Sequence, residues 1–508
     1  MAIQMPRFIP WDCNWIFNTK TLRIMKKLII FLFVAVALSS CKKMLDEVPK
    51  SFISKANFYQ TESDAIAAIR GAYSSFQTDY YGITYYLFIT LHADYANGRG
   101  SQAPITLFDR ILDQTNIDRS RVNWSTLYQQ INQANAVLGN VPQIGNITPA
   151  VKTRILAEAR FLRAMAYFNL VRGYGPVPIK TTESIDISSI AGVREPESKV
   201  YELILTDALA AEKDLPESVG AETGRASKHA AKMLLAQVYL TLEKWTEAAT
   251  MSNDVIASGR YSLVGVKRQE DFYKIFATIT NSEDIMSLHH SDTRQSQIPI
   301  YEHRPSTPPY NYSSGGNFAW LPNLNSFIGS SWDNNDLRKS FNLYTKYLGP
   351  NGDSISLPAA SPILFKKFIT APNGFGSYSV PIYRYTEAFL IYAEAAAMAA
   401  GSPPALALER LNMIKRRAYG YEPASVSPVD YPAGMSKEAF REAVLKERGY
   451  EFILEGRRWW DLKRTGRAKS GMEAAGRPFI DARLLWPIPN EEINNNPALS
   501  QKDQNPGY

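Results

Sequence analysis

The chain has 508 residues, and its 56 lysines and arginines exceed its 49 acidic residues, which gives a formal net charge of +7. Residues 1–40 hold five of the basic residues and one of the acidic ones, so the remainder has 51 against 48. This near balance argues against a nucleic-acid partner, and two cysteines in the whole chain are too few for a zinc site built on cysteine.

The first recognisable segment in chain order is a secretory leader at residues 25–40. Two lysines follow Met25, an apolar run occupies 28–38, and Leu-Ser-Ser precedes Cys41. A cationic start, a short apolar core and small residues before a cleavage point form a signal peptide, and the cysteine at that point makes it a lipobox. The run is too short to span a membrane, which takes roughly 20 apolar residues. We therefore expect residues 1–24 to be a misassigned start and Met25 to be the true one.

Lipid on Cys41 would leave the mature chain without a free thiol, so neither a disulfide nor thiol catalysis is open to it. A single domain from 41 to 508 must then be stabilised by its core, and it is long enough for that. We expect this domain outside the cytoplasm, anchored to a bacterial membrane by lipid.

Four pairs of helices are predicted along the domain, because apolar residues recur at helical spacing and Gly or Pro marks the ends. The third pair is the clearest, since small alanines in 230–240 are followed by Trp245 behind a turn, which resembles the tetratricopeptide pattern. Such pairs stack because one pair alone cannot bury its apolar face. The expected fold is all-α dominated, with about four tetratricopeptide-like pairs. They are 62–76 with 124–138, 151–174 with 198–215, 227–242 with 245–258, and 385–400 with 405–418.

An irregular insertion is predicted from about 279 to 381. This segment lacks sustained periodicity and is rich in Pro, Gly, Ser, Asn and aromatic residues. Irregular segments of this length are commonly functional, so we expect the insertion to form a binding face.

A last long helix is predicted from Lys437 to about Arg464. Gly449 and Gly456 fall on one stripe of it, which suggests that another backbone packs closely there. A second stripe carries alternating charges, which we interpret as a structural ion-pair seam. Its members are Arg448, Glu451, Glu455, Arg458 and Asp461.

Short motifs occur in order between the lipobox and the end of the chain. They are Leu45-Asp46-Glu47-Val48-Pro49, Ala68-Ile69-Arg70-Gly71-Ala72-Tyr73, Ala157-Glu158-Ala159-Arg160-Phe161-Leu162-Arg163-Ala164, Tyr174-Gly175-Pro176-Val177-Pro178, Glu447-Arg448-Gly449-Tyr450-Glu451-Phe452, Gly456-Arg457-Arg458-Trp459-Trp460-Asp461 and Leu485-Trp486-Pro487-Ile488-Pro489. In this order they resemble the SusD/RagB family of outer-membrane nutrient-binding lipoproteins, from Cys41 onward. The resemblance implies helix pairs that support a variable binding face on the outer surface of the outer membrane. It also implies that the protein captures oligosaccharide as a lid on a SusC-like TonB-dependent channel.

Sugar capture needs exposed aromatic faces and a few hydrogen-bonding groups. The resemblance implies that glycan contacts come from the early loop 92–100, which leads toward Trp124, and from the insertion. The candidates by position are Asp94, Arg99, Trp124, Tyr312 and Trp320.

Each aromatic candidate also has a structural interpretation. The interpretation of Trp124 as a core anchor at the start of its helix is favoured, since large aromatic residues are mostly buried. Tyr312 and Trp320 stand among Gly and Asn, where burial is less easily arranged.

No metal or cofactor is expected, because His289 and His290 are neighbours on a strand and would face opposite ways. Two alternatives to a binding protein stay open. A glycoside hydrolase would need two carboxylates flanking the bond, and no such pair is recognisable. A repeat scaffold that binds protein alone is compatible with the helix pairs.

Overall fold

The computed structural model describes most of the chain from residue 58 onward. Met25, Cys41 and Tyr312 lie outside the described residues, so the lipobox and one candidate binding residue stay predictions. In the described part, no helix combines the length and apolarity that crossing a membrane takes. The described residues are 23, 24, 27, 58–75, 84–186, 189, 191–291, 296, 298, 302, 320–349, 351–368 and 379–508.

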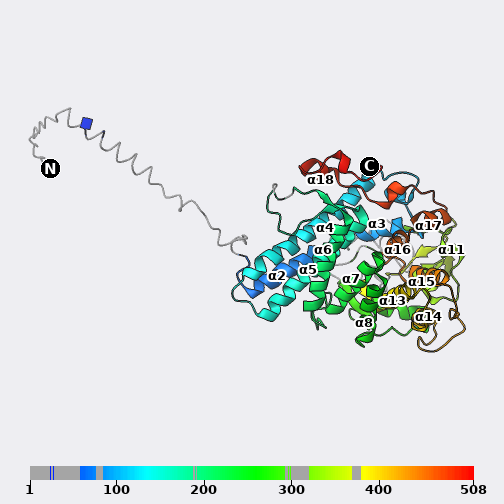
Figure 1. Cartoon of the computed structure of the whole chain (residues 1–508). Helices are drawn as coiled ribbons and strands as arrows, with labels where there is room; N and C mark the ends of the chain where they lie inside the picture. Colours follow the sequence, from blue (N-terminus) through cyan, green and yellow to red (C-terminus); the bar gives the residue numbers. More distant parts are fainter. Residues whose placement is uncertain are drawn as a thin grey trace, which may run out of the picture. The chain divides into compact units, whose positions relative to one another are not determined.

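A row of helices in chain order dominates the described part, and each contacts the next (Figure 1). The all-α dominated fold is therefore confirmed, and each predicted pair is present as two helices in contact. The tetratricopeptide-like character of the pairs stays a prediction. The row consists of α2 (Glu62–Ser75), α4 (Gln114–Asn140), α5 (Pro149–Tyr174), α6 (Glu197–Asp214), α7 (Lys228–Thr241), α8 (Trp245–Ala257), α13 (Tyr385–Ala400) and α14 (Ala405–Ala418).

Helix α4 begins ten residues earlier than the sequence predicted. The carboxylate of Asp113 accepts a hydrogen bond from the Asn116 backbone N–H at 2.9 Å, which caps the first turn. Trp124 therefore lies within α4 rather than at its start.

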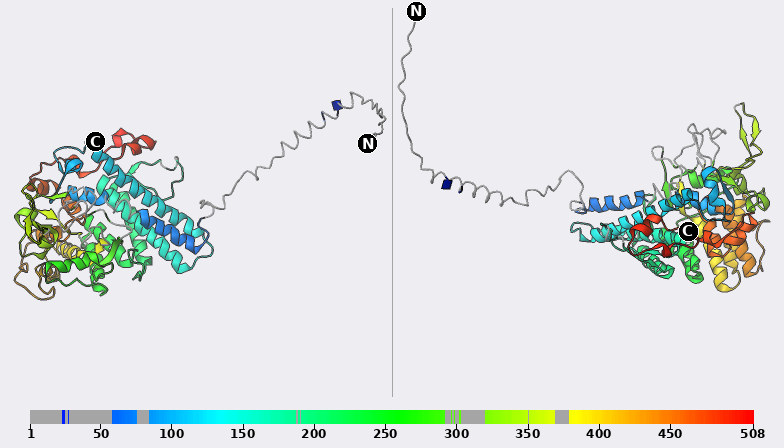
Figure 2. Two further views of the ribbon diagram at one scale, coloured as in Figure 1. Left: turned by 180° about the vertical axis from the view of Figure 1, so that it is seen from behind. Right: turned by 90° about the horizontal axis from the view of Figure 1, so that it is seen from above.

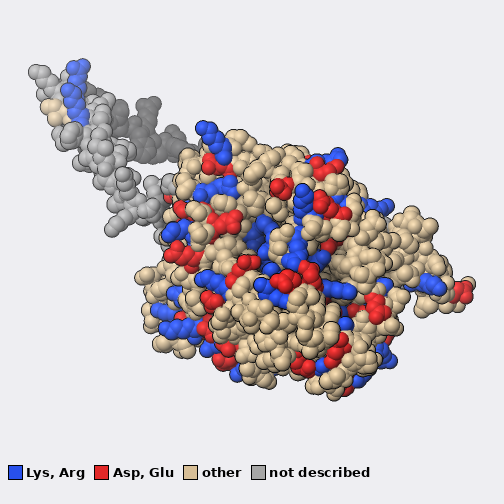
Figure 3. All heavy atoms as spheres, turned by 45° about the vertical axis from the view of Figure 1, so that its right-hand side comes forward, with Lys and Arg blue, Asp and Glu red and all other residues tan. Residues whose placement is uncertain are grey.

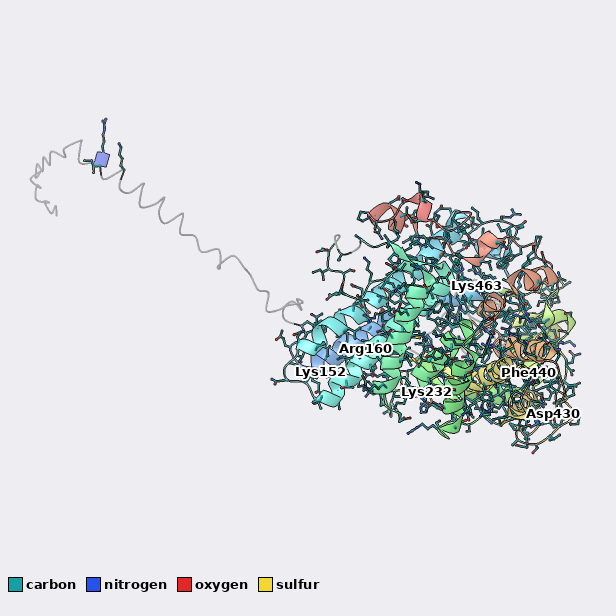
Figure 4. All side chains as sticks on the ribbon, in the orientation of Figure 1. Lys152, Arg160, Lys232, Asp430, Phe440 and Lys463 are labelled. Carbon is teal, nitrogen blue, oxygen red and sulfur yellow. The ribbon has the colours of Figure 1, made fainter. Side chains whose placement is uncertain are left out.

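Polar side chains also join neighbouring helices of the row. The ammonium of Lys232 on α7 pairs with Asp254 of α8 at 2.5 Å and with Glu212 of α6 at 3.6 Å. Figure 4 labels Lys232 at this position between the helices.

Five two-stranded antiparallel ribbons accompany the helices in the described part. Two of them lie within the insertion, a third brings its two ends together, and a fourth joins the insertion to the early loop. The ribbons are β1 (Ala96–Gly98) with β5 (Trp320–Pro322), β2 (Val177–Pro178) with β3 (Arg194–Glu195), β4 (Asp284–His289) with β10 (Ser379–Arg384), β6 (Leu343–Tyr344) with β9 (Leu364–Phe365), and β7 (Lys346–Leu348) with β8 (Ser354–Ser356).

The remaining helices complete the described architecture. Those of the insertion and the segment before it are η6 (Gln269–Phe272), α9 (Tyr273–Ala277), α11 (Phe327–Ser330) and α12 (Leu337–Asn342), and the β7–β8 hairpin stands out from them (Figure 2, right, yellow-green). The others are α3 (Tyr85–His92), η3 (Gly100–Thr106), η4 (Val141–Gln143), α15 (Lys437–Glu451), α16 (Arg458–Arg464), α17 (Ala468–Ala474), η7 (Asp481–Leu484), α18 (Asn490–Asn495) and η8 (Gln501–Asp503).

Helix α3 lies at the centre of an aromatic core. All eight of its residues are buried, and Phe88 meets Trp486 edge to face at a centroid distance of 5.2 Å. The Trp486 indole N–H donates to His92 Nε2 at 3.2 Å, and Trp459 lies against His92. These aromatic side chains therefore serve packing.

The prediction of one helix from Lys437 to Arg464 is wrong, because the backbone breaks between α15 and α16. Leu454 and Gly456 take left-handed φ values of 61° and 72°. Side chains from distant segments satisfy the backbone groups that the break exposes. Lys367 Nζ donates to the Ile453 carbonyl at 2.8 Å, and the Tyr95 hydroxyl accepts from the Leu454 N–H at 3.0 Å.

The two stripe glycines also meet side chains rather than another backbone. A Cβ on Gly456 would lie 2.8 Å from the ring of Tyr85, and one on Gly449 would lie 3.5 Å from the ring of Phe327. The close approach that the sequence suggested is present at Gly456, and its partner is an aromatic ring.

The charged stripe is a structural ion-pair network, as predicted, and its partners come from other elements. The carboxylate of Glu451 pairs with Arg384 at 2.7 Å and with Arg417 at 2.5 Å, and all three side chains are buried. The network also includes Arg338, Lys367, Glu283, Glu447 and Glu455. Buried charges of this kind position elements by mutual hydrogen bonding, since each one alone would be costly.

Candidate binding surface

The early loop and the insertion meet in one antiparallel ribbon. Strand β1 pairs with β5, so that Gly98 lies opposite Trp320 and Ala96 lies opposite Pro322. The Asn323 backbone N–H donates to the Tyr95 carbonyl at 2.7 Å. The two regions that the sequence singled out for ligand contact are therefore neighbours in space.

Asp94 is held by the scaffold. Arg458 donates from Nη2 to Asp94 Oδ2 at 2.6 Å and from Nε to Oδ1 at 3.0 Å, and Asp94 is buried. Its carboxylate thus joins the early loop to α16.

Both candidate tryptophans are buried. Trp124 is 3% exposed and packs 4.9 Å from the ring centroids of both Tyr128 and Tyr174, which matches the core-anchor interpretation. Trp320 is 0% exposed, so the expectation that it escapes burial is wrong. Pairing of its short strand with β1 places the indole in the core instead of on the surface.

Arg99 follows β1 directly and is exposed. A pocket of about 280 Å³ lies beside the ribbon, where the amides of Asn97, Asn323 and Asn325 are the main polar groups. Asn323 already donates to the carbonyls of Asp94 and Ala475, so its amide is part of the scaffold. No aromatic ring lines this pocket among the residues that the structure describes.

A larger pocket of about 510 Å³ lies beside the β7–β8 hairpin, and we call it the tyrosine pocket. Its aromatic side chains come from α9, α12, β6 and β7. The ring of Tyr273 meets Phe341 edge to face at 5.0 Å, and Tyr273 and Tyr347 are half-buried. The lining residues are Gln269, Glu270, Tyr273, Phe341, Tyr344, Lys346, Tyr347, Leu348, Ser354 and Lys366.

The polar groups of the tyrosine pocket suit hydroxyl-rich ligands. Gln269 donates to one carboxylate oxygen of Glu270 at 2.8 Å, and both residues line the pocket. Burial, together with the negative charge of Glu302, raises the pKa of Tyr273 to about 12, so its hydroxyl stays a hydrogen-bond donor at neutral pH.

Sequence reasoning missed the tyrosine pocket. Its residues belong to four separate segments of the chain. One segment, with Gln269, Glu270 and Tyr273, precedes the predicted insertion, and another, with Lys366, lies near its end. The closely spaced Tyr344, Lys346 and Tyr347 were the available signal, because they place two aromatic rings and a cation within four residues of the insertion.

Nothing in the described ranges gathers three or more His, Cys, Asp or Glu side chains around a possible metal position. His289 instead shares a hydrogen bond of 2.8 Å with the Ser379 hydroxyl across the β4–β10 ribbon.

Glu302, a buried residue of the insertion, should make stability depend on pH. Burial raises the pKa of its carboxyl to about 8, although the Phe368 N–H donates to it at 3.1 Å. The folded state holds this proton more tightly than the unfolded one, so the stabilisation is present at acid pH and is lost as pH rises toward 8. Between about pH 5 and pH 8, the free energy of unfolding should fall for the wild type and fall less for Glu302→Gln. We expect the two decreases to differ by a few kcal/mol. Urea unfolding at both pH values measures this, and equal slopes for the two proteins would contradict it.

The surface charge is mixed in sign. Lysine and arginine residues are interspersed with acidic ones on the face that Figure 3 shows.

Comparison with known proteins connects this architecture to one group. A sequence model described as "SusD family" matches residues 344–508, and one described as "Starch-binding associating with outer membrane" matches residues 43–240. "SusD-like protein P2" of Formosa agariphila is 28% identical over 94% of this chain and 99% of its own length.

Solved structures share the fold. A SusD homolog from Bacteroides thetaiotaomicron superposes with a TM-score of 0.77 at 24% identity, over 89% of this chain and 98% of its own. A structure named "Laminarin binding SusD-like protein" superposes with a TM-score of 0.70 at 23% identity, over 89% of this chain and 100% of its own.

Proposed function

Because the chain belongs to the SusD/RagB family, we propose that it captures a glycan at the outer surface of a bacterial outer membrane and passes it to a SusC-like TonB-dependent transporter. The description of one matching family model names starch binding and the outer membrane, and one structural relative is titled laminarin binding. Lipid on Cys41 would anchor the domain 41–508 and keep it at high effective concentration beside the transporter.

The tyrosine pocket is the observation that carries this proposal. Aromatic side chains offer flat apolar faces on which sugar rings stack, and Glu270, Gln269 and the lysines offer hydrogen bonds to hydroxyl groups. Arg99, exposed at the end of the β1–β5 ribbon, is proposed as a second contact, and Tyr312 stays a candidate from the sequence alone.

The pocket favours binding over hydrolysis. Most glycoside hydrolases use two carboxylates, about 5 to 9.5 Å apart, on either side of the bond they cleave. Among the described residues that line the tyrosine pocket, Glu270 is the one carboxylate. We therefore propose a protein without catalytic activity.

Isothermal titration of the purified domain with a panel of oligosaccharides tests the proposal. We expect at least one to bind, and Tyr347→Ala to weaken that binding about tenfold or more through loss of stacking. Tyr421→Ala is the matched control, because Tyr421 is exposed in a loop outside the pocket, and it should bind as the wild type does.

Two outcomes count against the proposal. Binding by no member of a broad panel contradicts glycan capture. Shorter products after incubation with a bound glycan contradict a binding protein and support the hydrolase alternative instead.

A further inference from the structure

Two lysines of the tyrosine pocket form no direct ion pair through their ammonium groups among the described residues. Lys346 comes from β7, and Lys366 directly follows β9. No hydrogen bond or ion pair joins either ammonium to another residue in the described part of the chain. Their positions, on β7 and directly after β9, bring two positive charges to one cavity of about 510 Å³.

Lys366 and its neighbour Lys367 differ in what their ammonium groups contact. Lys367 points into the core, where it pairs with Glu455 at 2.5 Å and donates to the Ile453 carbonyl at 2.8 Å. Lys366 is half-buried on the side of the pocket, and its backbone alone is tied to the scaffold, through the Asn342 carbonyl at 2.8 Å. One lysine thus serves the fold, and the other is available to a ligand.

A half-buried ammonium with no carboxylate in direct contact is unfavourable in the empty protein. Burial lowers the pKa of Lys366, and the nearby charge of Glu270 offsets this only in part. An anionic group that entered the pocket would supply the missing counter-charge in surroundings where water screens it poorly.

The balance of charge in the pocket is positive. Glu270 is the one acid among the described lining residues, and one of its oxygens accepts from Gln269. Two cations against one anion favour a ligand with negative charge, while Tyr273 and Tyr347 require one with flat apolar faces.

From this geometry we propose that the tyrosine pocket selects glycans that carry anionic substituents, with Lys346 and Lys366 binding a carboxylate or sulfate group on the sugar. The proposal rests on the proposed function, which it deepens by naming the class of glycan. Lys366 is the determinant of this selectivity, because it is the less exposed of the two cations and depends most on the ligand for a partner.

Titration with matched pairs of glycans separates the two proposals. One pair is laminarin oligosaccharide and its chemically sulfated form, and the other is oligogalacturonate and its methyl ester. We expect the anionic member of at least one pair to bind about tenfold more tightly at low salt, with the preference falling as ionic strength rises. A preference in the sulfate pair, the carboxylate pair or both identifies which anion the site takes.

Variants assign the preference to the pocket. Lys366→Gln removes the charge and keeps most of the side-chain length, so we expect it to abolish the preference for the anionic member. Lys469→Gln makes the same change at an exposed position of α17 and should preserve the preference. Thermal unfolding of both variants verifies that they fold.

The outcomes are distinguishable. Equal binding of both members of each pair, or a preference that persists in Lys366→Gln, overturns anion selection and leaves glycan capture intact. Binding of neither member in either pair, together with failure across the neutral panel, overturns the proposed function itself.

Discussion

Replacing Arg384 with methionine is expected to lower the free energy of unfolding by about 3–5 kcal/mol. The buried guanidinium donates from Nη1 to Glu451 at 2.7 Å and from Nε to Glu455 at 2.8 Å. Methionine fills a similar volume but leaves these carboxylates with one cation fewer, in a place that water does not reach. Urea unfolding at neutral pH measures the loss.

The pH dependence of that loss is a second signature. Burial raises the pKa of Glu455, but Arg384 and Lys367 outweigh it and hold the pKa below its usual value. Without Arg384 this pKa rises, so Glu455 takes up a proton at mildly acidic pH and no longer needs a cation. The stabilisation by Arg384 is therefore present at neutral pH and is lost as pH falls, and the difference between variant and wild type should be smaller at pH 5 than at pH 8.

Arg110→Met is the matched control for Arg384→Met. Arg110 pairs with Asp109 at 2.8 Å, but its side chain is 64% exposed, so solvent screens the pair. We expect no measurable change in stability. If the two variants had equal free energies of unfolding, the buried ion pairs of Arg384 would contribute nothing to stability.

The second large effect is expected at Gly456, where alanine should lower the free energy of unfolding by about 2–4 kcal/mol. Gly456 has a φ of 72°, and the added methyl group would lie 2.8 Å from the ring of Tyr85. That ring has little room to move, because its hydroxyl donates to the Gly456 carbonyl at 3.1 Å and accepts from the Trp460 indole at 3.2 Å. Thermal unfolding measures the effect.

Gly71→Ala is the control with the opposite sign. Gly71 lies inside α2, and an added Cβ would meet nothing within 4 Å. Alanine should therefore stabilise the helix by about 0.5–1 kcal/mol. If both alanine variants lose stability, a general intolerance of the chain to alanine explains the result better than the strain at Gly456.

Much of the helical framework was predictable because its signals are local. Helices α13 and α14 begin and end at the predicted residues, since Gly401 and the prolines after it terminate one helix and begin the next. Helix α3 was not predicted, because its run Tyr-Tyr-Leu-Phe-Ile-Thr-Leu-His is buried on all sides and shows no helical period.

The candidate site was less predictable, since exposure depends on partners that are distant in the chain. Trp320 and Tyr347 belong to the same insertion, yet one is buried against the early loop and the other lines a pocket. Asp94 was recognised as a charged residue of the right loop, but its partner Arg458 lies 364 residues away.

The sequence by itself determined the family, the helix pairs and the expectation of a lipid anchor. The reason is that the ordered motifs, the apolar periodicity and the residues that end helices are all patterns of neighbouring residues. Only the tertiary structure decided which charges become a buried network, where the last helix breaks, and which lysines remain for a ligand. Lys366 and Lys367 are adjacent and chemically identical, and they differ in role because only one of them reaches Glu455 and the carbonyls of the broken helix.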